Sequence, residues 1–159
     1  MLFTLICCQA IFSQPGKYAG SKQMLIGKTY TDSHKIVGLV GYTPVEGSVL
    51  NDINDPELII GDVFRKGTTY VIVFSIKEDT ALENYQIADV VEIKGVAKGW
   101  TVRSACRQKK QPDSYIFVFG KETLAEYMKT IKKAWRFNPD KRRVEVIPVK
   151  GIDCENIGC

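Results

Sequence analysis

The sequence predicts an α+β fold in which one long helix, at about residues 121–136, covers one face of a mostly antiparallel sheet of about five to seven strands. Three observations favour this fold. Short apolar runs with strand character recur between residues 58 and 119, helical apolar spacing is found only in 121–136, and a last strand-like run covers 142–149. The chain has 159 residues, of which 45% are hydrophobic and 25% charged, and this is typical of one globular domain.

The first thirteen residues, MLFTLICCQAIFS, carry no charge and precede the polar, Gly- and Pro-containing stretch QPGKYAGSK. This apolar run is too short to span a bilayer as a helix, but it fits the apolar region of a secretory signal. We therefore expect residues 1–13 to be a signal peptide and 14–159 to be a single globular domain without a transmembrane segment. A buried N-terminal strand is the alternative, because no positive residue precedes the run.

The cysteines extend this prediction of an exported protein, either periplasmic or secreted. Lipoprotein anchoring at Cys8 is disfavoured, because Cys7 stands where a lipoprotein signal has Gly, Ala or Ser. After removal of residues 1–13, three cysteines remain, and an oxidising compartment permits one disulfide among them. We predict a bond between Cys106 and Cys154, with Cys159 left over; a bond between Cys154 and Cys159 is the alternative.

The strands are expected in order along the chain. Residues 34–40 are apolar but interrupted by glycine, whereas residues 43–56 contain turn and loop residues. The runs 58–64 and 68–76 form a hairpin through a short Gly-containing connection, and 68–76 is apolar on both faces, as in a central strand. Further strands are predicted at 87–93, 100–107, 115–119 and 142–149.

The long helix is predicted from spacing and charge. Leu124, Met128, Ile131 and Trp135 recur at intervals of four, three and four residues, which places them on one face of a helix. The acidic residues of 121–136 lie near its start and the basic residues near its end, which is the order that the helix dipole favours.

A resemblance is carried by Lys133-Ala134-Trp135 and by the tail Lys150-Gly151-Ile152-Asp153-Cys154-Glu155-Asn156, separated by a basic turn and a strand. This last third of the chain loosely resembles the C-terminal end of small exported proteins of Gram-negative bacteria. The resemblance implies export, but those proteins have no established activity that it could transfer.

Known catalytic patterns are missing from the sequence. His34 is the single histidine, and no nucleophile-elbow, zinc-protease, Walker A or dinucleotide-binding motif occurs. Asp52, Asp55 and Glu57 offer oxygen ligands, but they fit polar turns better than a cation loop. A pair such as Glu92 and Asp62 could serve a glycan hydrolase if the fold brought the two together. No cofactor or metal site is expected.

Charge is distributed unevenly. Residues 94–150 hold ten lysines and five arginines against five acids, whereas residues 1–93 hold seven basic residues against eleven acids. We expect a binding module that meets a protein or an anionic envelope component through this basic face, and export disfavours nucleic acid. A glycan hydrolase with paired carboxylates and a structural envelope protein are the alternatives. The residues assigned to the basic face are Lys129, Lys132, Lys133, Arg136, Lys141, Arg142 and Arg143.

Overall fold

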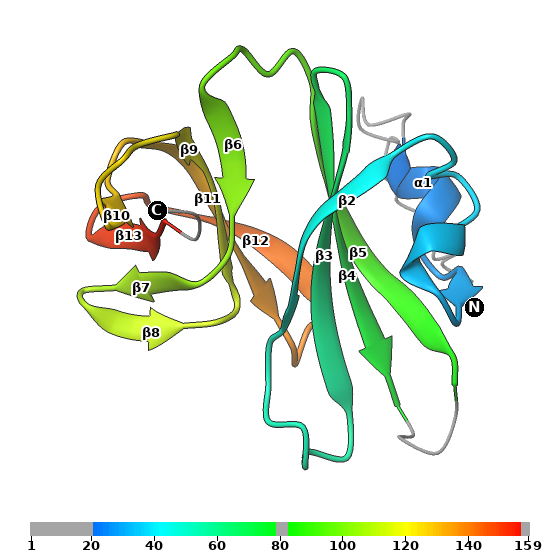
Figure 1. The fold of residues 1–159 in the computed structure, drawn as a ribbon. Coiled ribbons are helices and arrows are strands. Elements are labelled where there is room, and N and C mark those ends of the chain that lie inside the picture. Colours follow the sequence, from blue (N-terminus) through cyan, green and yellow to red (C-terminus); the bar gives the residue numbers. More distant parts are fainter. Residues whose placement is uncertain (1–20, 79–82, 157–159) are drawn as a thin grey trace, which may run out of the picture.

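The computed structural model describes residues 21–78 and 83–156, and this part of the chain is built almost entirely of antiparallel strands (Figure 1). The prediction of an α+β fold with a long helix is wrong. The described helices are the five-residue α1 (Ser21–Leu25) and the short 3-10 helix η1 (Ser33–Lys35). No helix in these two ranges is long and apolar enough to cross a bilayer. The signal peptide predicted at residues 1–13 lies outside the described residues.

The largest sheet has five strands in the order β1-β5-β4-β3-β2. Its central strand β4 is buried on both faces, as its continuous apolar run predicts. The hairpin that joins β3 to β4 is also present where the sequence predicts it. The strands are β1 (Thr29–Tyr30), β2 (Thr43–Val49), β3 (Leu58–Lys66), β4 (Thr69–Lys77) and β5 (Tyr85–Ile93).

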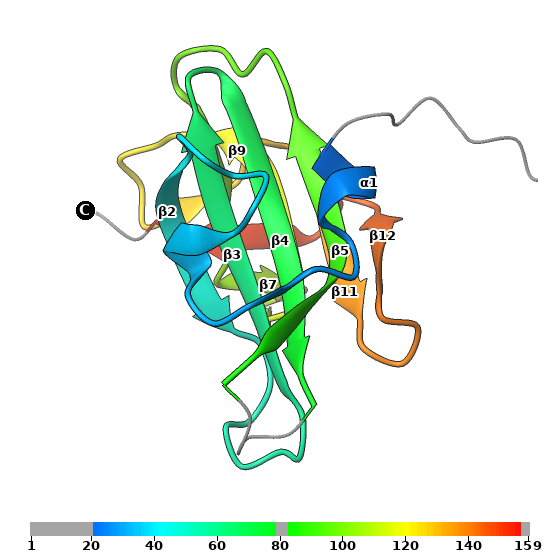
Figure 2. The same cartoon turned by 90° about the vertical axis from the view of Figure 1, so that its right-hand side faces the viewer.

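One face of this sheet is covered by the N-terminal segment. Leu25 of α1, together with Ile36 and Leu39 of the loop after η1, packs on the side chains of β3, β4 and β5, including Val71 and Val73. Figure 2 shows α1 and this segment lying across the sheet. The segment therefore takes the place that the predicted long helix was expected to fill.

The other face is covered by a smaller sheet that carries Phe117 and Phe137, and a third sheet packs on the far side of that one, around Cys106 and Cys154. Phe74 of β4 stacks on Phe137 at 5.2 Å and meets Phe117 edge-on at 5.0 Å. A Cβ on Gly61 would lie 2.5 Å from the Phe117 ring, so glycine allows this ring to press against β3. One small sheet has the order β12-β11-β9-β6 and the other β10-β13-β7-β8. The strands are β6 (Trp100–Arg103), β7 (Cys106–Gln108), β8 (Gln111–Asp113), β9 (Ile116–Lys121), β10 (Tyr127–Met128), β11 (Ile131–Asn138), β12 (Arg143–Ile147) and β13 (Ile152–Glu155).

Residues 121–136 contain the strands β10 and β11 and the loop 122–126 rather than a helix, because β9 needs partners on both edges. All but the last residue of β9 are buried, so its backbone groups must pair within the protein. The strand β11 supplies one set of partners and β6 the other. In β11 the residues Trp135 and Phe137 alternate with Arg136, whereas Leu124, which the helix would bury, is 97% exposed.

The strand predicted at residues 34–40 is also absent. Backbone hydrogen bonds from Leu39 N to Ile36 O and from Tyr42 N to Leu39 O, each 3.0 Å long, close two successive turns there. The strand begins instead at Thr43, in a stretch whose Pro and Gly predicted a turn. Pro44 is tolerated because β2 is an edge strand of its sheet, which leaves a missing backbone donor without consequence.

The predicted disulfide between Cys106 and Cys154 is present, with an S–S distance of 2.04 Å. The two cysteines are paired directly across β7 and β13. Both are buried in a small apolar cluster with Ile116, Met128 and Ile152. The bond therefore fastens the C-terminal strand to the middle of the chain.

Candidate functional site

The seven predicted basic residues do not form one continuous set of free charges. Arg136 lies 3.2 Å from Asp113, and Arg142 binds both Glu57 at 2.6 Å and Glu78 at 2.5 Å. The hydrogen bond that Arg142 donates to Glu78 is the main reason that the pKa of Arg142 is raised. Since Glu57 and Glu78 flank β3 and β4, Arg142 ties the β11–β12 hairpin to the large sheet.

Two more of the predicted cations share one carboxylate. Lys141 contacts Glu145 at 2.9 Å, and Arg143 approaches the same oxygen at 3.6 Å. The hydrogen bond from Lys141 lowers the pKa of Glu145, which keeps this carboxylate charged. The hairpin therefore carries much less unbalanced positive charge than its sequence indicates.

Lys132 and Lys133 are exposed, and no ion pair within 4.0 Å involves them in the described part of the chain. The ammonium of Lys132 lies 5.7 Å from the centre of the Trp100 ring, which is half-buried and packs on Phe119 at 5.3 Å. Lys121 is paired directly with Trp100 across β9 and β6, so these two side chains share a face. Lys133 pairs with Phe119 and joins the same face.

These residues, Trp100, Lys121, Lys132 and Lys133, are called the Trp100 surface below. Lys132 and Lys133 are among the predicted basic residues, whereas Lys121 and the central position of Trp100 were not predicted. Their proximity follows from the pairing of β6, β9 and β11, which a helix at 121–136 would not allow. Lys129 is not part of this surface; its charge adds to the hydrogen bond from Arg107 in lowering the pKa of Asp153.

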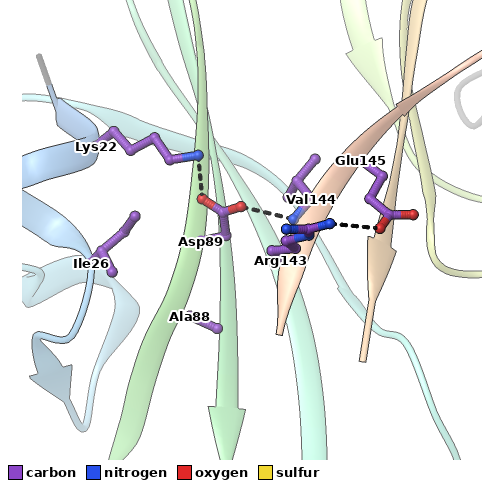
Figure 3. A pocket seen from close by; sticks show the side chains of 7 residues that line it. All are labelled: Lys22, Ile26, Ala88, Asp89, Arg143, Val144 and Glu145. Carbon is purple, nitrogen blue, oxygen red and sulfur yellow. Dashed lines mark hydrogen bonds and ion pairs between the residues drawn. The ribbon is translucent and has the colours of Figure 1, made fainter. Parts of the chain in front are cut away.

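A shallow pocket of about 440 Å³ lies between α1, β5 and β12 (Figure 3). At its centre lies Asp89, which is only 4% exposed. Its carboxylate forms an ion pair with Lys22 at 2.7 Å and accepts a hydrogen bond from the Val144 amide at 2.7 Å. A buried carboxylate is stable only when such partners compensate for its lost hydration. The pocket lining is Lys22, Ile26, Ala88, Asp89, Arg143, Val144 and Glu145.

The charges of this pocket balance one another. Lys22 is engaged by Asp89, and the guanidinium of Arg143 turns toward Glu145, as Figure 3 shows. The arrangement joins the N-terminal helix to the β11–β12 hairpin and leaves no cation directed into the pocket. It therefore acts as a structural junction rather than as an anion site.

The carboxylates considered for hydrolysis are not brought together. Asp62 on β3 and Glu92 on β5 are separated by β4, which sets the two strands about 10 Å apart. Glu92 contacts Lys94 at 3.2 Å. The described residues therefore give these two groups no shared pocket.

Asp62 belongs instead to a buried polar cluster with Tyr30 and Ser75. Within the described ranges, Tyr30 Oη, Asp62 Oδ2 and Ser75 Oγ are buried and have no hydrogen bond of normal geometry. Burial raises the pKa of Asp62, although the nearby Tyr30 hydroxyl opposes the rise. Burial also raises the pKa of Tyr30.

The remaining candidates are engaged in local structure. Asp52 accepts hydrogen bonds from the backbone and side chain of Asn54, at 2.9 and 2.8 Å, in a polar turn. His34 is exposed and its Nδ1 lies 3.2 Å from Asp32. No group of three or more metal-ligating side chains is found in residues 21–78 and 83–156.

Comparison with known proteins adds no assignment. No protein-family model matches the sequence, and neither curated proteins nor solved structures show a significant similarity to the chain.

Proposed function

We propose that this protein is a small exported binding module that meets an anionic partner through the Trp100 surface. The observation that carries the proposal is the set of three exposed lysines around a half-buried tryptophan, on one face of β6, β9 and β11. These lysines form no ion pair with a carboxylate of the described residues, so an anionic partner can bind them without breaking an existing ion pair. The tryptophan adds an apolar surface beside them.

Export is supported by the disulfide and by the uncharged apolar start of the sequence. A bond between two buried cysteines is typical of proteins that fold in an oxidising compartment. An anionic envelope component or an acidic protein is therefore the class of partner that we propose, and the buried cluster and the balanced pocket give no support to catalysis.

Chromatography on heparin, used as a model polyanion, tests the surface. Removing two free charges with Lys132→Ala and Lys133→Ala should lower the eluting salt concentration clearly. Exposed charges act over a Debye length of about 10 Å at 0.1 M salt, so local arrangement matters as well as net charge.

The matched control removes two charges of the same sign from the ion-paired hairpin, as Lys141→Ala with Arg143→Ala. We expect this variant to elute close to wild type, because both side chains are already engaged by Glu145. Equal shifts for the two double variants would show that only net charge matters and would contradict the proposal.

A further inference from the structure

The loop between η1 and β2 exposes two valines, three residues apart, that alternate with buried apolar residues. Its residues 36–42, IVGLVGY, contain no charged side chain. Ile36 and Leu39 are buried against the large sheet, whereas Val37 is 78% and Val40 is 83% exposed. Two of the most exposed apolar side chains in the described ranges thus lie in one short loop.

The backbone of the loop holds these valines outward. Its two successive turns are closed by hydrogen bonds, and Gly38 and Gly41 take positive φ angles of 103° and 82°. A Cβ on Gly38 would lie 3.0 Å from the Leu25 side chain, so glycine lets the loop pack tightly on α1. The outward valines are therefore a fixed feature and not the result of a loosely placed chain.

Two lysines lie beside the loop. The ammonium of Lys66 donates to the Val40 carbonyl at 3.4 Å and lies 5.6 Å from the Tyr42 ring. Lys35 precedes the loop, and its charge is partly balanced by Asp32 at 3.3 Å.

We propose that residues 35–42, with Lys66, form a contact site for an anionic lipid bilayer. Two valines cover far too little area for a stable protein interface, but they can enter the headgroup region of a bilayer. The neighbouring cations then face lipid phosphates. The site lies on the face of the large sheet opposite the two smaller sheets, so it is separate from the Trp100 surface.

Cosedimentation with vesicles tests the proposal. The full chain should bind vesicles that contain about one third phosphatidylglycerol in phosphatidylcholine, and pure phosphatidylcholine clearly less. Val37→Asp with Val40→Asp should lower the partition coefficient about tenfold or more, since a charge replaces each apolar contact. Leu124→Asp with Val146→Asp, at side chains that are 97% and 79% exposed elsewhere on the surface, adds the same two charges; this matched control should bind as wild type.

Further variants separate the two parts of the site. Lys66→Glu should weaken binding to anionic vesicles, whereas Lys150→Glu, at another exposed lysine, should have a smaller effect. Val37→Trp should strengthen binding, which guards against misreading a folding defect as lost affinity. Absence of wild-type binding, equal binding by the valine double variant, or loss only with Lys132→Ala and Lys133→Ala would overturn the proposal.

Discussion

At the scale of single residues, burial decides which charges are available for function. Arg142 and Asp89 are charged residues that hold elements of the fold together, because each has two partners from other segments. Lys132 and Lys133, which look the same in sequence, are left with their charges exposed. Charge counting along the chain cannot separate these two classes, since the partners are distant in sequence.

Asp62 provides a test at this scale. Its pKa is raised above the usual value of 3.8 by burial, so the folded protein holds this proton more tightly than the unfolded chain. The stability from this group is fully present below the unfolded pKa, and it is lost as pH rises through the folded pKa. Asp62→Asn should therefore remove this loss and raise the stability by about 1 kcal/mol at neutral pH.

Urea denaturation at several pH values measures this effect. Asp32→Asn is the control, because a hydrogen bond from the His34 amide lowers the pKa of Asp32. The contribution of Asp32 is present above its unfolded pKa and lost as pH falls, so its removal should change the pH profile in the opposite sense. Parallel profiles for wild type and Asp62→Asn would contradict the prediction.

At the scale of elements, the sequence predicts those strands whose pattern is unambiguous. The hairpin of β3 and β4 follows from two apolar runs and a glycine turn, and the disulfide follows from the position of Cys106 in a strand. The stretch 121–136 was ambiguous because Met128, Ile131 and Trp135 fit a helical stripe as well as separate strands. The stretch forms strands because the backbone groups of β9 need hydrogen-bond partners on both edges. This requirement follows from the assembled sheet and cannot be read from the sequence of 121–136.

The Trp100 surface was only partly predictable for the same reason. Lys132 and Lys133 could be found from charge density, but their neighbour Trp100 is about thirty residues away in sequence. The bulge between Ile131 and Lys133 sets which side chains of β11 meet that ring. Such an irregularity in register has no clear sequence signal.

A comparison of two truncations tests the strand at 131–138. Trp135→Ala should cost about 3–5 kcal/mol, because this side chain is 6% exposed and packs in the main core. Leu124→Ala should change stability by less than about 0.5 kcal/mol, because Leu124 is 97% exposed. A helix at 121–136 would make both changes costly, so comparable losses in denaturant melts would contradict the observed strand.

At the scale of the whole molecule, the five-stranded sheet is covered on one face by the N-terminal segment and on the other by the sheet β12-β11-β9-β6, whose far side carries the sheet β10-β13-β7-β8 (Figures 1 and 2). The small sheet with β7 and β13 has four short strands and packs on β9 and β11 through a small apolar cluster. The bond between Cys106 and Cys154 joins two strands of this sheet, so it fastens the C-terminal strand β13 to β7.

Removal of this bond should be costly for the whole fold. The cysteines are 48 residues apart, so the bond restricts a long loop in the unfolded chain. Cys106→Ala with Cys154→Ala should lower the free energy of unfolding by about 2–4 kcal/mol. Because both cysteines are buried, reductant should act on the native protein only after local opening of β7 and β13.

Denaturant melts of oxidised wild type and of the double variant give the size of the effect, and peptide mapping without reductant gives the connectivity. A peptide that joins Cys106 to Cys154 is expected, and Cys159→Ala should leave that peptide unchanged. A peptide joining Cys154 to Cys159, or equal stability of the double variant, would show that β13 is held by its strand pairing and the Arg107–Asp153 ion pair at 2.7 Å. In that case noncovalent contacts would hold the C-terminal strand, and the disulfide would not stabilise the fold by restricting the unfolded chain.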